Sequence, residues 1–475
     1  MNNYNDLDEL KDECGVFGVY NSNSHDVARL TYYALYALQH RGQESAGIAV
    51  NENGDINYHK AMGLVPEAFS EKILNSLKGK AAIGHVRYST TGASHLENAQ
   101  PMVVKYKSGQ MALAHNGNLV NAAEIRDRLE DNGTIFQSTI DSEVIANMIS
   151  RCRTSNSNIE EAIVQMMKEI KGSYALVILT PKKLIGIRDP FGIRPLCIGK
   201  IDDSYVLASE TCALDAVGAQ YLRDVEPGEI VIINEDGMNS INTGIEKRSK
   251  LCVFEFVYIA RPDSFIDGAS VHQARIEAGK RLAVEHPVEA DLVIGVPDSG
   301  ITAALGYSMQ SGIPYAQGLI KNRYVGRTFI QPDQGQREIE VRIKLNAMRA
   351  VINGKRVIMV DDSVVRGTTS KRLVQILRDA GATEVHLRVS SPPVKFSCYF
   401  GIDTPSREQL PASRHSVESI RRMIEADSLG YLSLEGLLKT PVDCKCDFCT
   451  ACYDGLYPMD VPEEGDKFSC DGSKK

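Results

Sequence analysis

Residues 356–370, RVIMVDDSVVRGTTS, decide the fold of the second half of this chain. The apolar run RVIMV predicts a buried strand that ends on two adjacent carboxylates, Asp361 and Asp362. The small residues RGTTS lead into KRLVQILRDAG, whose apolar spacing predicts an amphipathic helix. Ligands of open α/β sheets bind beyond the carboxyl ends of the strands, so the loop between this strand and this helix is a candidate binding site.

The composition of this loop favours a phosphate group as its ligand. Backbone N–H groups, threonine and serine hydroxyls and a helix N-terminus together bind anions. Two carboxylates beside such an anion suit a phosphorylated sugar, whose hydroxyls or bound metal ion they would contact. In this combination the chain resembles the phosphoribosyltransferases, which bind 5-phosphoribosyl-1-pyrophosphate (PRPP). The alternative interpretation is an ordinary strand–turn–helix with a solvated pair of aspartates.

Two further segments of the same half fit a pyrophosphate site. The segment PDSGIT (297–302) follows the apolar run DLVIG and precedes a predicted helix. Its backbone N–H groups would bind phosphate oxygens, although a type I turn has the same composition. Residues 321–344 hold six lysines and arginines interleaved with Gly, Pro and Gln. A long loop of this kind is either a solvated surface loop or a functional segment, and we expect a lid that closes over pyrophosphate.

Length and composition indicate an enzyme of at least two domains. The chain has 475 residues, too many for one ordinary core. Its net charge of −8 and pI near 5.8 argue against a nucleic-acid-binding protein. No apolar run approaches the roughly 20 residues of a membrane-spanning helix, and the polar, acidic N-terminus is unlike a signal peptide. Eleven cysteines, an odd number, favour the free thiols of a cytoplasmic protein over a disulfide framework.

The pattern of apolar segments changes near residue 245. The first part holds many short alternating apolar segments, which predict two packed sheets flanked by helices. Helical patterns interrupt them around 26–39, 120–130, 141–152 and 159–170. From about 272 to 395, helical stretches alternate with apolar strands, and this alternation predicts a parallel sheet. The strand segments are ADLVIGVP, IPYAQGLI, KRVIMVDD and EVHLRVS.

The first part opens with a cysteine that suits a nucleophile. Cys14 follows a 13-residue polar leader and begins the apolar segment CGVFGVY. A cysteine reacts as the thiolate and needs a base. Cleavage before Cys14 would free an α-amine of pKa about 7.8, roughly a third unprotonated at pH 7.5, whereas a lysine near 10.4 offers roughly a thousandth. Taken alone, a buried strand cysteine is the simpler interpretation.

Four segments of the same part resemble the N-terminal-nucleophile (Ntn) glutamine amidotransferases of class II. These segments are HRGQESAG (40–47), GHVRYSTTG (84–92), AHNGNL (114–119) and TIDSE (139–143). The resemblance implies that Arg87 binds the α-carboxylate of glutamine and Asp141 its α-ammonium. It also implies an oxyanion hole formed by the Asn116 side chain and the Gly117 backbone N–H. The implied glutamine-binding residues are Arg41, Arg87, Thr90 and Asp141.

One family combines both halves in this order, and the chain resembles it from about 14 to 460: the amidophosphoribosyltransferases. The resemblance implies that glutamine is hydrolysed at Cys14 and that its ammonia is transferred to C1 of PRPP. The products are 5-phosphoribosylamine, glutamate and pyrophosphate, in the first committed step of purine synthesis. The implied architecture is a propeptide (1–13), a four-layer αββα Ntn-hydrolase domain (14–245), a type I phosphoribosyltransferase domain (246–440) with a parallel sheet, and a C-terminal segment (441–475).

The resemblance also implies cofactors, partners and a residue set for PRPP. A Mg²⁺ ion would be held by Ser299, Asp361 and Asp362. The enzyme would be a cytoplasmic homotetramer that purine nucleotides inhibit by feedback. The implied PRPP-binding residues are Asp298, Ser299, Gly300, Lys321, Lys344, Asp361, Asp362, Ser363, Arg366, Gly367, Thr368 and Thr369.

A cluster of four cysteines near the C-terminus, CKCDFCTAC (444–452), indicates a metal site. Spacing alone allows either a four-thiolate zinc ion or an iron–sulfur cluster. The chain resembles the Bacillus and animal branch of the family, which has a leader peptide and a 4Fe–4S cluster. That resemblance implies a structural cluster held by Cys252, Cys398, Cys449 and Cys452. Cys444 and Cys446 are additional to the pattern and leave the ligand set open.

Two other classes of protein share half of these features. A class II amidotransferase that aminates another substrate would share the first part but lack the motif VIMVDDSVVRGTTS. A non-enzymatic PRPP-sensing regulator would share the second part but would not need Cys14 and its amide-binding segments. Because both parts are intact here, the sequence favours the bifunctional enzyme.

Overall fold

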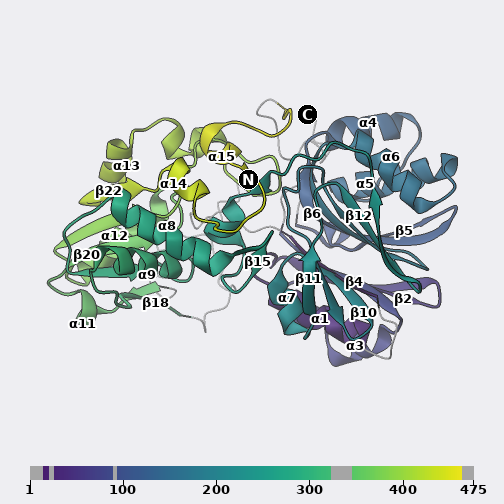
Figure 1. The fold of residues 1–475 in the computed structure, drawn as a ribbon, viewed down its shortest axis with the longest axis horizontal. Helices are drawn as coiled ribbons and strands as arrows, with labels where there is room; N and C mark the ends of the chain where they lie inside the picture. Colours follow the sequence, from purple (N-terminus) through teal and green to yellow (C-terminus); the bar gives the residue numbers. More distant parts are fainter. Residues whose placement is uncertain (1–13, 21–25, 89–93, 323–344, 463–475) are drawn as a thin grey trace.

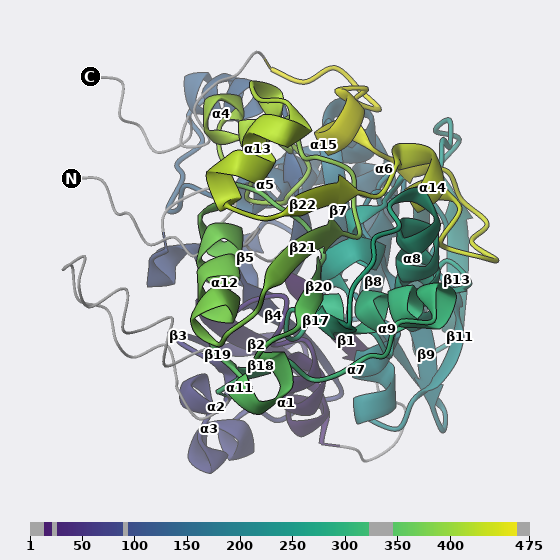
Figure 2. The ribbon, with the colours of Figure 1, turned by 90° about the vertical axis from the view of Figure 1, so that its left-hand side faces the viewer.

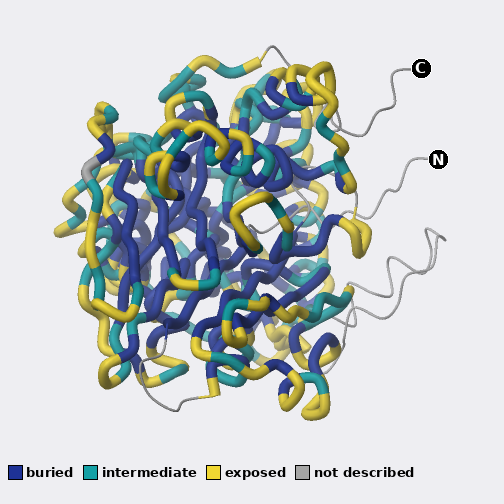
Figure 3. Tube along the Cα trace, turned by 90° about the vertical axis from the view of Figure 1, so that its right-hand side faces the viewer, coloured by how far each residue is buried: buried dark blue, intermediate teal, exposed yellow. Residues whose placement is uncertain are grey.

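The structure, a computed structural model of the chain, describes residues 14–20, 26–88, 94–322 and 345–462. The N-terminal strands and helices form one body and the C-terminal ones form a second body beside it (Figure 1). Figure 3 shows that most strands of the N-terminal body are buried, while exposed residues lie in its loops, its outer helices and the edge strands at residues 55–62 and 220–224. Within the described ranges, no helix combines the length and the apolar character needed to cross a membrane.

The N-terminal body contains two large sheets. The first has seven strands in the order β11-β9-β10-β1-β4-β2-β3, and the second has six in the order β13-β12-β8-β7-β6-β5. The strands are, in chain order, β1 Gly15–Tyr20, β2 Ser45–Glu52, β3 Asp55–Met62, β4 Ala81–Arg87, β5 Met102–Tyr106, β6 Gly109–Leu119, β7 Gly172–Leu179, β8 Leu184–Arg188, β9 Cys197–Ile201, β10 Ser204–Ala208, β11 Gln220–Asp224, β12 Glu229–Asn234 and β13 Gly237–Asn242.

Small and branched apolar side chains join the two sheets face to face. Val16 and Ile83 of the first sheet pack in one buried cluster with Ala114 and Val177 of the second. Helices cover the outer faces (Figure 1). Those beside the first sheet are α1 Val27–Ala37, α2 Val65–Ala68, α3 Glu71–Ser76 and α7 Thr211–Ala216, and those beside the second are α4 Ala122–Asp131, α5 Asp141–Ser155 and α6 Ile159–Glu169. The predicted αββα layering and the four predicted helices are confirmed.

The C-terminal body is built on a four-stranded parallel sheet in the order β17-β20-β21-β22. Alternate side chains of β20 face opposite layers: Ile358 packs with α8 and α9, and Met359 packs with α12 and α13. Figure 2 shows the sheet between these two pairs of helices. The elements are α8 Val271–Glu285, β17 Leu292–Gly295, α9 Gly300–Ser311, β20 Arg356–Asp361, α12 Thr368–Asp379, β21 Glu384–Val389, α13 Val417–Ile424 and β22 Ser428–Tyr431.

Two details of this sheet differ from the prediction. IPYAQGLI (313–320) does not form a full strand of the sheet: Tyr315 makes an isolated parallel bridge to Val293, and the next residues enter the small hairpin β18 Leu319–Lys321 and β19 Leu345–Ala347. Its place as a fourth strand is taken by β22, on the opposite edge. β22 was missed because its four residues, SLGY, are too few to show a period and include a glycine.

Short elements complete the C-terminal body and tie its last segment down. β14 Leu251–Cys252 pairs in parallel with β23 Phe448–Cys449, so that segments about 200 residues apart lie together. A π-helical turn (η2, Glu255–Ile259) follows β14 and packs against α8. The remaining short elements are η1 Leu96–Asn98 in the N-terminal body and β15 Phe265–Ile266, β16 Ala269–Ser270, α11 Arg349–Ile352, η3 Arg407–Gln409, η4 Pro411–Ser413, α14 Leu434–Leu438 and α15 Ala451–Asp454.

Candidate active sites

Cys14 lies immediately before β1, and its side chain is 7% exposed. Its thiol donates a hydrogen bond of 3.5 Å to the backbone oxygen of Tyr88. Burial raises the pKa of Cys14 to about 11, the Arg87 guanidinium lowers it, and the Asp141 and Glu44 carboxylates raise it. Residues from β4, the start of α5 and the loop before β2 therefore surround the thiol. The structure brings together Cys14, Arg87 and Asp141, as the sequence predicted.

Strand pairing places Arg87 beside this cysteine. β1 and β4 are antiparallel, with Gly15 opposite Val86, so Arg87 at the end of β4 reaches the start of β1. The Arg87 side chain is 2% exposed, and its Nη1 lies 3.9 Å from Glu44 Oε2. A buried arginine at this position can bind a ligand carboxylate through its fork of N–H groups.

Asn116 has a buried side-chain amide without a hydrogen-bond partner among the described residues. It lies on β6 and is 1% exposed, and neither its Oδ1 nor its Nδ2 has a hydrogen-bond partner within the described residues. Gly117 follows with φ +146°, and a Cβ atom there would lie 2.1 Å from the Ser173 carbonyl oxygen. Because buried polar groups are almost always paired, an unpaired amide indicates a group that a ligand completes.

Asp141 opens α5 and is fixed by its surroundings. Its Oδ2 accepts a hydrogen bond of 2.9 Å from the Leu119 N–H, and its Oδ1 lies 3.4 Å from His115 Nδ1. Burial favours the protonated carboxyl, but His115 and the backbone N–H groups of Leu119 and Ser142 outweigh it and lower the pKa of Asp141 overall. The side chain is therefore a carboxylate at neutral pH, as binding of an ammonium group requires.

Arg41 has a different place from the one predicted. It is fully buried, and its Nε donates a hydrogen bond of 3.1 Å to the Cys14 carbonyl oxygen. Its Nη1 binds Glu210 at 2.5 Å, and its Nη2 binds Glu255 of η2 at 2.7 Å. The guanidinium is thus engaged by two carboxylates and a backbone oxygen, which leaves it poorly placed to take the carboxylate of glutamine as well.

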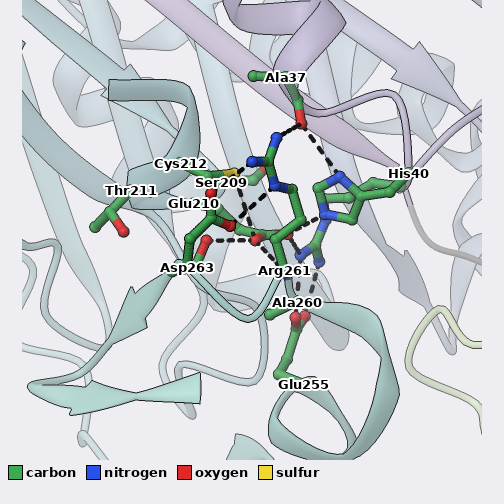
Figure 4. Close-up of polar contacts among 12 residues, drawn as sticks. Ala37, His40, Ser209, Glu210, Thr211, Cys212, Glu255, Ala260, Arg261 and Asp263 are labelled. Atoms are coloured by element: carbon green, nitrogen blue, oxygen red, sulfur yellow. Dashed lines mark hydrogen bonds and ion pairs between the residues drawn. The ribbon is translucent and has the colours of Figure 1, made fainter. Parts of the chain in front are cut away.

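Glu210 is the centre of this buried network (Figure 4). It accepts hydrogen bonds from His40 Nε2 (2.7 Å), the Ser264 hydroxyl (2.7 Å) and the Arg261 backbone N–H (2.9 Å). Its carboxylate is fully buried, yet His40 and Arg41 hold the pKa of Glu210 far below its usual value against the effect of burial. Since Ser264 and Arg261 belong to the C-terminal body, the network joins the two bodies. It reaches Cys14 through the hydrogen bond from Arg41 to the Cys14 carbonyl oxygen.

Glu210 and Glu255 were not among the site residues predicted from the sequence. Glu255 is 0% exposed and also lies 3.6 Å from Arg194 Nη1. One signal was available, because Glu255 is a single carboxylate in the apolar run LCVFEFVYIA. A charged residue inside such a run is almost never buried unless it is paired. Its partner, Arg41, lies 214 positions away in the chain.

The second candidate site lies at the carboxyl end of β20. The Asp362 N–H donates a 2.9 Å hydrogen bond to Asp361 Oδ1, and the Ser363 hydroxyl donates one of 2.6 Å to Asp362 Oδ1. Burial raises the pKa of Asp362, and hydrogen bonds from Ser299 and Ser363 oppose that rise. The contact with Ser299 brings the loop after β17 to the loop after β20, as the sequence predicted.

Two glycines allow this close approach. Gly300 begins α9, and a Cβ atom there would lie 2.4 Å from the Val360 carbonyl oxygen of β20. Gly367, at φ +84°, is the N-cap of α12, and a residue with a side chain would be strained in that conformation. The N-termini of both helices therefore face the same strand ends, where backbone N–H groups bind anions.

A cavity of about 530 Å³ lies next to these loops. Lys321 and Asp298 line it, with Lys321 Nζ 3.3 Å from Asp298 Oδ2. Other lining residues are Pro297, Ile301, Gln317 and Asn346. Of the predicted site residues, Thr90 and Lys344 lie outside the described residues, as do the leader (1–13) and most of the predicted lid, residues 323–344.

Four cysteines gather where β14 and β23 pair, with Cys252 opposite Cys449. Burial raises the pKa of Cys452, and the thiols of Cys252, Cys398 and Cys449 raise it further. Burial also raises the pKa of Cys252, with added effects from Cys449 and Cys398. These mutual effects show that the four thiols are neighbours. The described part of the chain contains no three His, Cys, Asp or Glu side chains close enough to hold a single metal ion.

Comparison with known proteins gives the same division of the chain. Residues 85–216 match the glutamine amidotransferase domain family, and residues 270–391 match the phosphoribosyl transferase domain family. An amidophosphoribosyltransferase from Archaeoglobus fulgidus is 52% identical over 453 residues, covering 95% of this chain and 99% of the relative. The enzyme of the same name from Bacillus subtilis is 52% identical over 460 residues, covering 96% of each. The chain belongs to the amidophosphoribosyltransferases.

Solved structures agree with this family membership. A glutamine PRPP amidotransferase from B. subtilis, complexed with ADP and GMP, has a TM-score of 0.89 at 52% identity, covering 95% of this chain and 98% of that one. A structure described as the allosteric regulatory enzyme of purine biosynthesis has a TM-score of 0.90, also at 52% identity, covering 95% and 97%. As an amidophosphoribosyltransferase, a metal-dependent glycosyltransferase with glutamine amidotransferase activity, the chain performs glutamine-dependent amidotransfer to PRPP in purine biosynthesis.

Proposed function

We propose that the two sites described above carry the two halves of this reaction. In the first, the Cys14 thiolate attacks the carboxamide carbon of glutamine, ammonia leaves, and water hydrolyses the thioester to glutamate. Arg87 binds the α-carboxylate and Asp141 the α-ammonium group. The observation that carries this assignment is the unpaired buried amide of Asn116, whose Nδ2 would bind the oxyanion together with the Gly117 N–H.

We assign Arg41 a positioning role in place of glutamine binding. Its hydrogen bond to the Cys14 carbonyl oxygen fixes the backbone of the nucleophile. Its ion pairs with Glu210 and Glu255 hold the guanidinium in place from both bodies. Thr90 keeps its predicted glutamine-binding role by resemblance alone.

The leader, residues 1–13, is proposed to be removed before the enzyme acts. With Cys14 inside the chain, burial raises its thiol pKa to about 11, so only about one thiol in 10⁴ is ionised at pH 7. A freed α-amine of pKa about 7.8 would accept the thiol proton far more readily. Cleavage would therefore supply a base, since of the described groups that act on Cys14 Arg87 is a permanent cation, Asp141 pairs with His115 and Glu44 lies beside Arg87.

In the second site, PRPP is proposed to lie across the carboxyl ends of β17 and β20. Ammonia would attack C1 of the ribose and displace pyrophosphate. Backbone N–H groups at the start of α9 and α12 would bind phosphate oxygens, with Lys321 beside the cavity. The full proposed set is Asp298, Ser299, Gly300, Lys321, Lys344, Asp361, Asp362, Ser363, Arg366, Gly367, Thr368 and Thr369.

The donor set at this site fits Mg²⁺. Asp361, Asp362 and the Ser299 hydroxyl offer oxygen ligands at one point, and Mg²⁺ takes few protein ligands alongside substrate phosphates and water. When bound, the ion would neutralise charge on the departing pyrophosphate. The two carboxylates would bind the ribose hydroxyls, and the burial of Asp361 and Asp362 restricts their movement. The N-termini of α9 and α12 would bind and orient the phosphate groups.

Ammonia is proposed to pass between the sites inside the protein, because it would be protonated in bulk water. Buried hydrogen bonds also join the N-terminal and C-terminal bodies. Ser173 Oγ donates to the Phe400 carbonyl oxygen at 2.7 Å, and Arg194 Nε donates to the same oxygen at 2.8 Å. Ser173 and Arg194 are both buried, so the junction between the two bodies is closed to solvent at this point, as a protected path for ammonia would require.

Asn116→Ala should lower glutamine-dependent turnover about 10²–10³-fold, because one oxyanion donor is lost. The KM for glutamine should change little, and ammonia-dependent synthesis should stay within about twofold of the parent enzyme. Steady-state assays with each nitrogen source measure both effects. Asn121→Ala is the matched control, since its amide binds only the backbone of residues 169 and 171. Equal loss of both activities in folded Asn116→Ala would contradict the assignment.

The four-cysteine group is proposed to hold a structural 4Fe–4S cluster. Four buried or half-buried thiols lie together there. Four thiolates are the usual ligands of a 4Fe–4S cluster, and the resemblance to the branch with such a cluster favours iron over zinc. The site lies between β14 and the C-terminal segment, so the cluster would tie that segment to the phosphoribosyltransferase domain.

Anaerobically purified enzyme should therefore contain about four irons per chain and absorb visible light. Cys452→Ser should lose most of this iron and lower the unfolding temperature, because one ligand of four is removed. Cys152→Ser, which changes a buried thiol of the other domain, is the control. Metal analysis decides the point, and stoichiometric zinc in place of iron would overturn the cluster assignment.

The remaining expectations follow from resemblance. We propose domain bounds of 14–245, 246–440 and 441–475, a cytoplasmic location, a homotetramer and inhibition by purine nucleotides. The relative from B. subtilis that was solved with ADP and GMP supports nucleotide binding as the regulatory chemistry. Sedimentation and inhibition by added GMP test the last two points.

A further inference from the structure

Two cysteines of the C-terminal segment stand apart from the four-cysteine group. The largest influences on the pKa of Cys444 and on that of Cys446 are the other thiol of the pair, burial, Asp267 and Arg188. Both side chains are partly exposed, between exposed residues on either side. They pack at the edge of a separate apolar cluster that includes Leu251. The proposed 4Fe–4S cluster therefore gives no role to Cys444 or Cys446.

Their sulfur atoms are close enough to bond after a small movement. Cys444 Sγ lies 2.8 Å from Cys446 Sγ, and a disulfide bond is about 2.05 Å long. The chain changes direction on both sides of Lys445: Asp443 has φ +71°, and a bend is centred on Cys446. The Cα atoms of residues two apart are at most about 6.6–7.2 Å apart even in an extended chain, and disulfides span roughly 4.4–6.8 Å. Rotation of two side chains would therefore close the bond.

The turn that carries this pair is anchored at both ends. The Cys444 N–H donates to the Pro441 carbonyl oxygen at 3.3 Å, and the Leu251 N–H donates to the Asp447 carbonyl oxygen at 2.9 Å. The Lys445 N–H reaches the Asp267 carbonyl oxygen at 3.4 Å. These contacts hold the two sulfur atoms in proximity before any bond forms.

The pair also has the asymmetry that thiol–disulfide exchange uses. A hydrogen bond from the Cys446 thiol lowers the pKa of Cys444, and the Arg188 guanidinium lowers it slightly further against burial and Asp267. The same hydrogen bond raises the pKa of Cys446. The thiolate that forms first is stabilised by the neighbouring thiol, which keeps its proton until the second step.

We propose that Cys444 and Cys446 form a reversible disulfide by exchange with a small-molecule or protein disulfide, and are a redox site separate from the four-cysteine group. The Cys444 thiolate attacks one sulfur of the incoming disulfide and releases one thiol. Cys446 then gives up its proton and attacks the Cys444 sulfur, which releases the second thiol. The protein loses two hydrogens and the incoming disulfide becomes two thiols, so electrons and atoms balance.

The position of the site connects it to the domain junction. Asp267, whose backbone oxygen accepts from Lys445, holds Arg188 through two hydrogen bonds of 2.9 and 2.8 Å. Arg188 ends β8 of the amidotransferase domain. A bond that locks the turn therefore acts on a contact between the two domains. A disulfide across one intervening residue is strained and exposed, and such bonds are the labile, reducible ones.

Peptide mapping tests this site directly, because Lys445 separates the two cysteines. Trypsin cuts after Lys445, so residues 440–445 and the peptide that starts at Cys446 stay together only through a disulfide. Anaerobically purified full-length enzyme is equilibrated with graded ratios of reduced to oxidised glutathione. Free thiols are then alkylated under denaturing conditions, and the digest is kept unreduced. We expect the linked peptide pair to rise from background to roughly half or more of the Cys444 signal and to disappear after reduction.

Cysteine variants and the iron content test whether the disulfide joins Cys444 to Cys446 and whether it forms independently of the four-cysteine group. Cys444→Ser should remove the linked pair, and Cys197→Ser, a buried thiol of β9, should leave it unchanged. Iron per chain should not fall as the disulfide forms. Full alkylation of both cysteines at every ratio would overturn the proposal, as would a metal that protects them from alkylation. A disulfide from Cys446 to Cys449 or Cys452 that persists in Cys444→Ser, or loss of iron in step with oxidation, would show that the site is not separate.

Discussion

Cys14→Ala should lower glutamine-dependent synthesis of 5-phosphoribosylamine by more than about 10³-fold, because the nucleophile is removed. Ammonia-dependent synthesis should stay within about twofold, since the PRPP site lies in the other domain and keeps its residues. Parallel assays with glutamine and with ammonium salts measure the two rates. The size of the difference between them is the expected signature of a chain with two separate sites.

Cys152→Ala is the matched control for this variant, because Cys152 is also buried in the amidotransferase domain but lies on α5, with no part in the site. The intact mass of the parent enzyme should correspond to a chain that begins at Cys14. A leader that persists in fully active enzyme would contradict the α-amine as base. Loss of both activities together in a folded Cys14→Ala enzyme would contradict the two-site account itself.

Asp362→Asn should produce the opposite pattern. Synthesis from either nitrogen source should fall about 10²–10³-fold, because a carboxylate that would hold ribose or Mg²⁺ becomes a neutral amide. Added ammonia should not restore the rate. Basal hydrolysis of glutamine, measured without PRPP as glutamate release, should stay within about twofold of the parent enzyme.

Asp379→Asn, at the exposed end of α12, is the control for a charge change in the same domain. Thermal melting checks that Asp362→Asn is folded, because Asp362 is buried and makes a hydrogen bond with Ser363. Rescue of synthesis by ammonia in this variant would place the defect in the glutamine site and refute the assignment of Asp362.

The fold was predictable wherever local pattern and tertiary environment agree. The helices of the amidotransferase domain show clear apolar periodicity, and β20 is a continuous apolar run buried on both faces, as strands of parallel sheets are. The prediction was wrong for residues 313–320, whose apolar run lies beside the sheet edge and enters a hairpin instead. Nothing in the eight residues distinguishes these two outcomes, because sheet pairing depends on segments far along the chain.

In the candidate sites too, residues in local motifs were predictable, whereas contacts between residues far apart in the chain were not. Cys14, Arg87 and Asp141 were predicted from segments whose chemistry is local, and the structure brings these three side chains together. The carboxylates that bind Arg41 in the structure, Glu210 and Glu255, were not predicted because they are 169 and 214 residues away. A cation in the segment HRG predicts an anion nearby, but only the fold determines whether that anion is a substrate or another side chain.

Ammonia released at Cys14 is proposed to be used at the PRPP site of the same chain without reaching the solvent. Processed enzyme is given glutamine labelled with ¹⁵N in its amide, together with PRPP and an excess of unlabelled ammonium at a pH near 7. Mass spectrometry of the trapped phosphoribosylamine then reports the origin of its nitrogen. We expect the product to carry mainly ¹⁵N; a product whose label is diluted to the isotopic ratio of the solution would show that the ammonia passes through the solvent.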